Sequence, residues 1–316
     1  MEVFCIVGPT SSGKSYIAHN VARKLIEFGV GTEIISCDSV QVYKYFDIGS
    51  AKVSIELRKE VPYHLIDIFE PNEGVFSAGD FRKRFDEIVW KLVSSNKIAI
   101  LVGGTGLYYK AVKVGIFEGP SANKNIRENL YRKVEKDGVE SLYSYLYHID
   151  PEYASKISKN DTRRIIRAIE VYEITGKKFS ELHKISTKKS PFKIYSFFIF
   201  PNRSELYSAI NHRVYKMIKE GFVDEVKWII SNYGKNIYPL NSIGYKEVRD
   251  YLDGKLGYND MIELIKKNTR NFAKRQITLF KHTSVDETII IDTINPKNLD
   301  IFAEIIFEKI ISLIGK

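Results

Sequence analysis

A glycine-rich loop near the N-terminus constrains this sequence more than any other feature. Residues 8–15 read Gly-Pro-Thr-Ser-Ser-Gly-Lys-Ser and match the phosphate-binding pattern G-x-x-x-x-G-K-[ST]. An apolar run at 3–7 precedes the loop, as a buried strand should, and the spacing of apolar residues in 16–28 predicts a helix after it. Backbone N–H groups and the helix N-terminus would surround phosphate oxygens, Lys14 adds a full charge, and Ser15 offers a hydroxyl to Mg²⁺. The sequence therefore predicts a polyphosphate site, without naming the molecule that carries the phosphates.

Two further apolar segments predict strands that end at polar residues. Residues 33–37 stop at Asp38, and residues 97–102 lead into Gly103-Gly104-Thr105-Gly106. Alternating strands and helices form parallel sheets, which bind ligands at the C-terminal ends of their strands. We therefore expect the phosphate loop, Asp38 and Thr105 to meet in one crevice.

The residues of this crevice allow more than one interpretation. Asp38 could hold Mg²⁺ through water or accept a proton from a nucleophile beside the phosphates. It could also only cap a turn, because Asp-Ser is common where strands end. The segment Gly103–Gly106 could bring backbone and hydroxyl donors to a second edge of the phosphates, or it could be a simple turn.

Composition narrows the class of protein. The 316 residues carry a formal net charge of +9, which indicates a polyanionic partner if the charge is clustered and only solubility if it is spread evenly. The two cysteines exclude a disulfide framework and a thiolate zinc site, and Cys5 and Cys37 are expected to be inert. The first residues already form a predicted core strand, no signal peptide is recognisable, and no apolar run is long enough to span a membrane. We expect a cytoplasmic protein.

The middle of the chain has a different pattern. Strand signals vanish between residues 123 and 189, and a helix is predicted from Asp161 until Thr175-Gly176 stops it. A strong β run at 192–200 then follows and is expected to return to the sheet. The segment is therefore predicted to be a helical insertion into an α/β core.

Two predicted helices carry basic stripes. Arg163, Arg164 and Arg167 lie opposite the apolar face of one helix, and a helix at 262–280 carries a stripe of Lys266, Arg270 and Lys274. Both could be solvated faces. Arginine suits phosphate recognition, however, and residues 266–281 contain six Lys or Arg and no acid. We therefore favour contacts with a nucleic-acid backbone.

Taken together, these segments resemble the tRNA dimethylallyltransferases, also called tRNA isopentenyltransferases. The matching segments follow the family's order and cover nearly the whole chain: residues 8–15, 35–43, 47–52, 64–68, 103–108, 164–172, 242–245 and 273–278. The departures are Ser50 where threonine is usual, Arg163 where glutamine is usual, and Leu279 where tryptophan is usual. The last departure concerns one stacking contact with tRNA and not the activity.

The resemblance implies a fold and a reaction. The fold is α/β, with a P-loop NTPase-like core of parallel sheet and flanking helices in residues 1–117 and 191–316, and an all-helical insertion domain in 118–190 that contacts tRNA. The reaction transfers a dimethylallyl group from dimethylallyl diphosphate to N6 of the adenosine 3′-adjacent to the anticodon and releases diphosphate. The phosphate loop would then hold the prenyl diphosphate and not ATP. The expected partners are dimethylallyl diphosphate and the anticodon stem-loop of tRNA, and the expected state is a monomer.

The resemblance also assigns roles to residues. Asp38 takes the proton of the attacking amine, Thr105 lies near the reacting ends, and Arg213 clamps the diphosphate. The cofactor is Mg²⁺, with Ser15 as a possible ligand. The residues assigned to the diphosphate are Gly8, Pro9, Thr10, Ser11, Ser12, Gly13, Lys14 and Ser15. The residues assigned to tRNA are Asp38, Ser39, Val40, Gln41, Thr105, Arg163, Arg164, Ile165, Ile166, Arg167, Ser242, Ile243, Gly244, Tyr245, Lys274, Arg275 and Gln276.

Three other classes share part of this pattern. A kinase of small metabolites would share the phosphate loop and Asp38, but it gives no reason for the basic helices. A prenyltransferase that acts on free AMP or ADP would share all the catalytic residues and differ in its affinity for tRNA. An RNA-binding protein without activity needs no pairing of Lys14 with Asp38.

Overall fold

The structure divides the chain into two compact units, which are described separately. The computed structural model describes residues 2–117, 119–185, 187–283 and 285–315. The larger unit comprises Met1–Lys113 and Ser190–Lys316, and the smaller unit comprises Val114–Lys189. Among the helices in the described ranges, none combines the length and the apolar character needed to cross a membrane.

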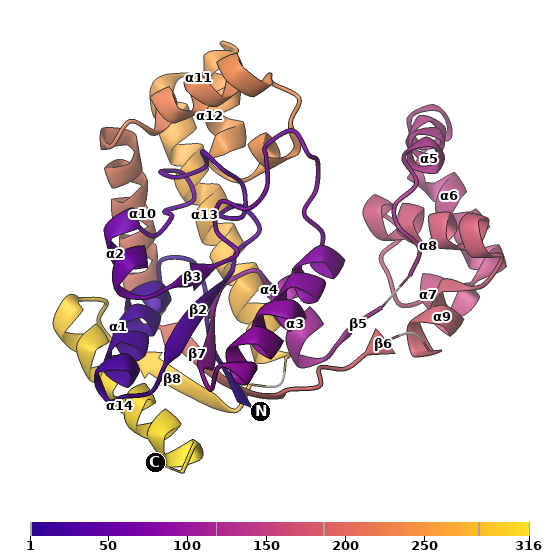
Figure 1. Cartoon of the computed structure of the whole chain (residues 1–316). Helices are drawn as coiled ribbons and strands as arrows, with labels where there is room; N and C mark the ends of the chain where they lie inside the picture. Colours follow the sequence, from indigo (N-terminus) through magenta and orange to yellow (C-terminus); the bar gives the residue numbers. More distant parts are fainter. Residues whose placement is uncertain (1, 118, 186, 284, 316) are drawn as a thin grey trace. The chain divides into compact units, whose positions relative to one another are not determined.

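A parallel sheet of six strands forms the centre of the larger unit (Figure 1). The strands lie in the order β3-β2-β4-β1-β7-β8, and each neighbouring pair is parallel. They are β1 (Glu2–Val7), β2 (Thr32–Cys37), β3 (Tyr63–His64), β4 (Ile98–Gly103), β7 (Lys193–Pro201) and β8 (Glu287–Ile291). The strands predicted at 33–37, 97–102 and 192–200 are present within one residue, and the predicted α/β fold with a parallel sheet is confirmed.

Helices cover both faces of this sheet (Figure 1). On one face lie α1 and α14, which pack side by side, and on the other lie α3, α4 and α13. The helices of the larger unit are α1 (Lys14–Glu27), α2 (Ile55–Glu60), α3 (Ala78–Ser94), α4 (Gly106–Lys113), α10 (Arg203–Lys219), α11 (Phe222–Tyr233), α12 (Tyr245–Leu252), α13 (Tyr258–Lys281) and α14 (Pro296–Leu313), with a 3-10 turn at Tyr238–Asn241.

The packing between the sheet and α1 fixes where the phosphate loop lies. Phe4 and Ile6 of β1 and Ile17 and Val21 of α1 are fully buried in one cluster, to which α14 adds Ile306. Burying such a side chain contributes about 1.5–3 kcal/mol relative to leaving it exposed. The loop between β1 and α1 therefore spans two elements that a well-packed core holds in place.

The smaller unit is a bundle of short helices with its own core. Its helices are α5 (Lys124–Asp137), α6 (Val139–Ile149), α7 (Pro151–Ala154), α8 (Thr162–Thr175) and α9 (Phe179–Ile185). The helix predicted from Asp161 is α8; Asp161 caps its first turn, and Gly176 ends it with a φ of 68°. Ile165 and Ile169 of α8 are fully buried in this core.

One prediction for this segment is wrong. The sequence showed no strand between residues 123 and 189, yet β6 (Thr187–Lys188) pairs with β5 (Ile116–Phe117) in an antiparallel ladder. Strands of two residues are too short to show a period in the sequence, so the pattern gave no signal.

Candidate active site

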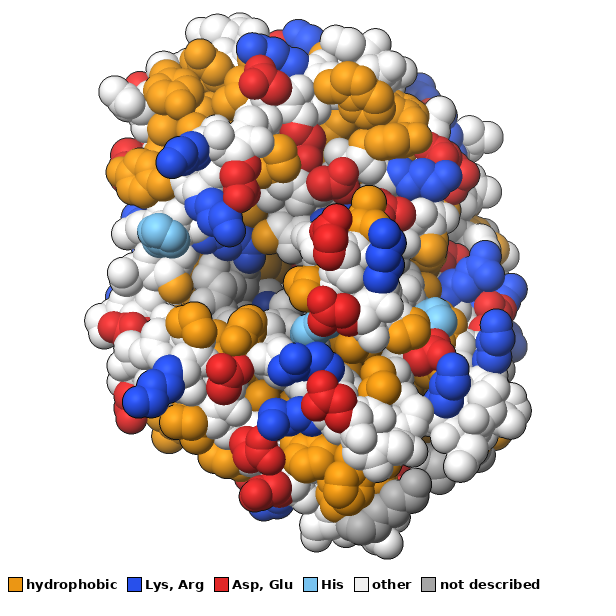
Figure 2. Space-filling view, turned by 60° about the vertical axis from the view of Figure 1, so that its left-hand side comes forward, with side chains coloured by type: hydrophobic (Ala, Val, Ile, Leu, Met, Phe, Trp, Pro, Cys, Tyr) orange, Lys and Arg blue, Asp and Glu red, His pale blue; other side chains and the backbone are white. Residues whose placement is uncertain are grey.

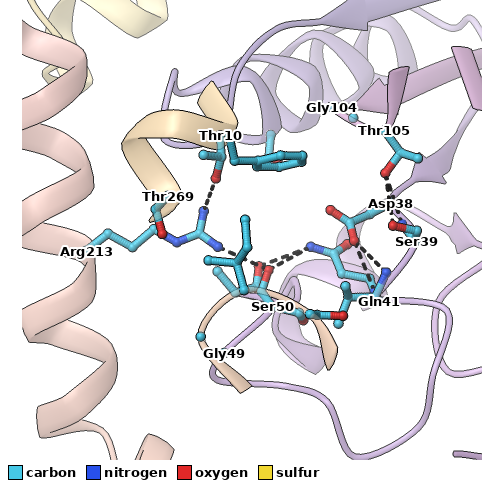
Figure 3. Close-up of a pocket in the computed structure, with 18 of the residues that line it drawn as sticks. Thr10, Asp38, Ser39, Gln41, Gly49, Ser50, Gly104, Thr105, Arg213 and Thr269 are labelled. Atoms are coloured by element: carbon cyan, nitrogen blue, oxygen red, sulfur yellow. Dashed lines mark hydrogen bonds between the residues drawn. The ribbon is translucent and has the colours of Figure 1, made fainter. Parts of the chain in front are cut away.

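A cavity of about 370 Å³ lies in the larger unit at the C-terminal ends of β1, β2 and β4. The phosphate loop, Asp38 and Thr105 all line it, and α10 and α13 close it from the other side (Figure 3). Figure 2 shows that this side of the molecule is hollowed and that Lys and Arg side chains lie at the edge of the hollow. The structure thus brings together the three segments that the sequence predicted to meet.

The phosphate loop has the tight geometry that its glycines allow. Gly13 has a φ of +82°, and a Cβ there would lie 2.6 Å from Leu299 Cδ2. Ser11 also has a positive φ, of 62°. Within the described residues, the buried hydroxyl oxygens of Ser11 and Ser12 have no hydrogen-bond partner. Such groups cost free energy unless a ligand or water satisfies them, as a phosphate bound in this loop would.

Two cations that line the cavity, Lys14 and Arg213, form hydrogen bonds to neutral oxygens of the protein. Lys14 Nζ donates to the Pro9 carbonyl at 3.1 Å, and Arg213 donates to Thr10 Oγ1 and to the Ser50 carbonyl, both at 3.2 Å. Among the residues that the structure describes, neither cation forms a salt bridge. Burial and the charge of Arg213 lower the pKa of Lys14 to about 8. An anion in the cavity would stabilise the charged forms of Lys14 and Arg213, which burial disfavours. The electrostatics therefore favour an anionic ligand.

Asp38 caps a turn with one of its two carboxylate oxygens. Its Oδ1 accepts hydrogen bonds from the backbone N–H groups of Val40 (2.8 Å) and Gln41 (3.2 Å), as a turn cap does. In the described part of the chain, Oδ2 has no hydrogen-bond partner, and the residue lines the cavity. One oxygen therefore fixes the side chain while the other is free to accept a proton from a ligand.

Thr105 follows β4 beside Asp38. Its hydroxyl oxygen accepts a hydrogen bond from the backbone N–H of Ser39 at 3.1 Å, and its own N–H donates to the Cys37 carbonyl at 3.2 Å. The backbones of β2 and β4 approach so closely here that a Cβ on Gly103 would lie 2.2 Å from the Cys37 carbonyl oxygen. This approach requires glycine and holds Thr105 at the cavity.

Comparison with known proteins adds to this geometry. The model of the IPP transferase family matches residues 41–283. The tRNA dimethylallyltransferase of Thermotoga petrophila is 44% identical over 282 residues, which cover 89% of this chain and 90% of that protein. The enzyme of the same name from Caldanaerobacter subterraneus is 43% identical and covers 89% of each chain. This chain belongs to the tRNA dimethylallyltransferase family.

Solved structures agree with this membership. The tRNA isopentenylpyrophosphate transferase of Bacillus halodurans superposes with a TM-score of 0.69 at 34% identity and covers 100% of this chain and 99% of its own. A eukaryotic dimethylallyltransferase acting on tRNA gives a TM-score of 0.72 at 28% identity, over 92% of this chain and 73% of its own. The resemblance to the tRNA dimethylallyltransferases inferred from the sequence is confirmed.

The residues that the family resemblance assigned to tRNA fall into two groups. Those that line the cavity, in addition to Asp38 and Thr105, are Ser39, Val40, Gln41, Ser242, Ile243, Gly244, Tyr245, Arg275 and Gln276. Lys274 is exposed on α13 but does not line the cavity, and the others belong to α8 of the smaller unit. Leu279, which replaces the family's usual tryptophan, packs against the start of α4, since a Cβ on Gly106 would lie 2.7 Å from its methyl carbons.

The side chain of Gln276 forms two hydrogen bonds within the protein. Its Oε1 accepts from the Thr10 N–H at 2.8 Å, and its Nε2 donates to the Gly104 carbonyl at 2.8 Å. The side chain is buried and joins the phosphate loop to the loop after β4. In this structure, both polar atoms of the side chain therefore hold the two loops together.

On α8, most side chains of the predicted tRNA motif also serve the protein's own packing. Ile165 and Ile166 are buried in the core of the smaller unit, and Arg167 donates to Glu170 at 2.6 Å and to the Pro120 carbonyl at 2.8 Å. Contact between tRNA and the two isoleucine side chains is excluded by this burial. Arg163 and Arg164 are exposed.

The predicted unpaired stripe on α13 is wrong in part. Lys266 is buried, forms a salt bridge with Glu263 at 2.6 Å, and lies 3.7 Å from the centre of the Tyr215 ring. Arg270 donates to Asn211 at 2.7 Å. The range without acids begins at residue 266, and the acidic partner, Glu263, lies three residues before it. Lys274 and Arg275 are exposed.

Sequence reasoning missed an apolar wall in the cavity. Ile210, Val214 and Met217 line it from α10, and Ile265 and Phe272 line it from α13. Both sets have helical spacing, which is the only signal that could have found them, and that spacing is typical of any core-facing helix. The wall makes the cavity charged at the phosphate loop and apolar opposite it.

Proposed function

We propose that the protein transfers a dimethylallyl group from dimethylallyl diphosphate to N6 of the adenosine 3′-adjacent to the tRNA anticodon and releases diphosphate. One observation carries the proposal: among the described residues, one cavity is lined by two cations that form no salt bridge, by a carboxylate with one oxygen that accepts no hydrogen bond, and by an apolar wall. A prenyl diphosphate has an anionic and an apolar end, so it matches such a cavity in a way that a nucleoside triphosphate does not. The relatives' names specify tRNA as the acceptor in those proteins.

The diphosphate end binds at the phosphate loop. The allylic C–O bond breaks and its electron pair stays on the diphosphate, so negative charge on that group grows in the transition state. The ammonium of Lys14, the guanidinium of Arg213 and the N–H groups of the loop are fixed before the reaction and stabilise this charge.

The acceptor is activated beside this site. The exocyclic amine of adenine is a weak nucleophile and must lose a proton as the new C–N bond forms. Asp38 Oδ2 accepts that proton while Oδ1 stays bonded to Val40 and Gln41, and Thr105 lies next to it. The apolar wall on α10 and α13 surrounds the dimethylallyl group and keeps water from the reacting carbon.

We also propose that Mg²⁺ is the cofactor. Within the described residues there is no cluster of three or more His, Cys, Asp or Glu side chains that could hold a metal. This fits Mg²⁺, which binds through one or two protein ligands, substrate phosphates and water. Ser15 lines the cavity and would supply the protein ligand. When bound, the ion neutralises charge on the diphosphate.

The tRNA binds over the cavity and beyond it. A base in an anticodon loop must turn out of its stack to reach a cavity of this kind. The exposed cations Lys274 and Arg275 on α13, and Arg163 and Arg164 in the helical insertion, bind the RNA backbone. We propose that the protein acts as a cytoplasmic monomer.

The test is to incubate the protein with dimethylallyl diphosphate, Mg²⁺ and unmodified tRNA and to analyse the digested nucleosides by mass spectrometry. Adenosine in the tRNA should gain one dimethylallyl group without any ATP. Parallel reactions with AMP and ADP should give little product. Modification of free nucleotides in preference to tRNA, or a requirement for ATP, would contradict the proposal.

A further inference from the structure

The carboxylate of Glu225, near the start of α11, accepts four hydrogen bonds. Three come from the consecutive backbone N–H groups of Asp47 (3.1 Å), Ile48 (2.6 Å) and Gly49 (3.2 Å), and one from the Tyr245 hydroxyl (2.8 Å). An ionised carboxylate has about four acceptor sites, one for each of these donors. Burial raises the pKa of Glu225, and these hydrogen bonds oppose the shift. A half-buried carboxylate thus ties a loop after β2 to helices almost two hundred residues later in the sequence.

The same loop also fits tightly against the helices. A Cβ on Gly49 would lie 2.2 Å from Phe222 Cε2 and 2.6 Å from Tyr245 Cζ. The backbone at Gly49 therefore touches the two aromatic rings that flank the hydrogen bonds of Glu225. Residues 47–49 have little freedom to move while Glu225 holds them.

The loop continues directly into the reacting groups. The carbonyl of Ser50 accepts from Arg213 Nη2 at 3.2 Å and from Gln41 Nε2 at 3.3 Å, and the backbone N–H of Gln41 donates to Asp38 Oδ1 (Figure 3). Ser50 therefore lies between the guanidinium and the carboxylate and is bonded toward both. Its position influences how far apart they are.

We infer that Glu225 is a positioning residue for the transfer reaction. By holding residues 47–49, it fixes the Ser50 carbonyl, and this carbonyl sets the distance between Arg213 at the diphosphate and Asp38 at the attacking amine. The inference rests on the proposed function, in which these two groups act on the same reaction. A displacement of about 1 Å in such a pair can cost about 10²-fold in rate.

The first test compares Glu225→Gln with Asp224→Asn. Glutamine keeps the volume but turns an NH₂ group toward backbone N–H donors, so the loop loses part of its anchor. Asp224 is the neighbouring carboxylate, is exposed, and pairs only with Lys227 among the described residues, which makes it a matched control. Glu225→Gln should lower kcat/KM by about 10- to 100-fold and raise the KM for dimethylallyl diphosphate, while Asp224→Asn should stay within about twofold of the parent.

A second measurement separates positioning from loss of folding. The dissociation constant of dimethylallyl diphosphate, measured without tRNA and below the melting temperature of each variant, should rise in Glu225→Gln. In an Arg213→Ala background the same substitution should have much less effect, because the group through which it acts is gone. If Glu225→Gln does not fold, Glu225→Asp keeps the charge, shortens the reach and takes its place in the cycle.

The outcomes distinguish the two claims. A parent protein that does not modify tRNA overturns the proposed function, whatever the variants do. A parent that modifies tRNA, with Glu225 variants equal to Asp224→Asn, overturns the positioning role alone. Equal effects of Glu225→Gln with and without Arg213, or a loss explained fully by the unfolded fraction, would also overturn it.

Discussion

Two pairs of basic side chains, one pair in each unit, have opposite surroundings. In the larger unit, Lys14 and Arg213 line a cavity and form no salt bridge with any described residue. In the smaller unit, Arg127 and Arg167 converge on the buried carboxylate of Glu170 at 2.8 Å and 2.6 Å. The family resemblance assigned Arg213 to the diphosphate and Arg167 to tRNA, but Arg167 already has a carboxylate partner within the protein.

This difference separates cations that can bind a ligand from cations that stabilise the fold. A cation that is desolvated and unpaired raises the free energy of the empty protein and is stabilised by an anion that enters. A cation that is already paired gains little from a ligand, and its removal leaves the charge of the buried partner uncompensated. We therefore expect substitutions in the cavity to change reaction and affinity, and substitutions around Glu170 to change stability.

The largest expected effect is on turnover, at Asp38. Asp38→Asn keeps an acceptor for the N–H groups of Val40 and Gln41 but cannot take up the proton of the amine. The loss of a general base should lower kcat by about 10²–10⁴-fold. Single-turnover kinetics with tRNA measure this, with melting temperature and tRNA affinity as controls. Near-parental turnover in this variant would remove Asp38 from the mechanism.

The next effect is on stability, at Glu170. Burial opposes ionisation of this carboxyl, but hydrogen bonds from Arg127 and Arg167 outweigh it and lower its pKa. Glu170→Ala leaves both arginines without their partner and should cost about 2–3 kcal/mol, below the range for fully buried pairs because the arginines reach solvent. Because the folded pKa is lowered, the stabilisation is present at neutral pH and is lost as pH falls through that lowered value.

Thermal denaturation at several pH values checks this prediction. The exposed Glu173 on the same helix provides the control, and Glu173→Ala should leave the melting temperature nearly unchanged. The affinity for dimethylallyl diphosphate should be the same in both variants. A Glu170 variant that melts like the parent would show that the paired arginines do not support the fold.

A smaller effect is expected from pH at Lys14. Because its pKa is lowered to about 8, the side chain is charged below this pH and becomes neutral above it. The affinity for dimethylallyl diphosphate should therefore fall as pH rises above 8, by at most about tenfold per pH unit. Calorimetric titrations between pH 7 and pH 10 test this, and Lys14→Ala should abolish the dependence. An equally steep decline in the variant would assign it to another group.

How much the sequence could predict depended on how local each feature is. The strands and the phosphate loop follow from patterns within short segments, and both are present. The meeting of Asp38 with Thr105 follows from the rule that parallel strands end at the same edge of the sheet, and it is also present. The partners of Lys266 and Arg167 lie three residues away on the same helices, at Glu263 and Glu170, so the i, i+3 spacing could have indicated both pairs. The role of Gln276 could not be predicted, because it depends on which distant residues the fold brings within reach. The four hydrogen-bond donors to Glu225 could not be predicted for the same reason.

The smallest expected effect concerns the exposed cations. Replacing Arg163 and Arg164, or Lys274 and Arg275, should weaken tRNA binding and reduce the slope of log K against log salt by roughly 0.7–0.9 for each phosphate that the variant no longer neutralises. Binding of dimethylallyl diphosphate should not change. Salt titrations of tRNA binding compare each pair with the parent. Unchanged slopes for both pairs would mean that these residues are an ordinary solvated surface.

The most direct test of the contrast between unpaired and paired cations is one titration with dimethylallyl diphosphate of three proteins: the parent, Lys14→Ala and Arg167→Ala. Thermal melts of the same samples accompany it. We predict that Lys14→Ala loses at least about tenfold in affinity while its melting temperature stays close to that of the parent. Arg167→Ala should keep the parental affinity and melt at a lower temperature. The reverse pattern, with affinity lost at Arg167 and retained at Lys14, would contradict the account.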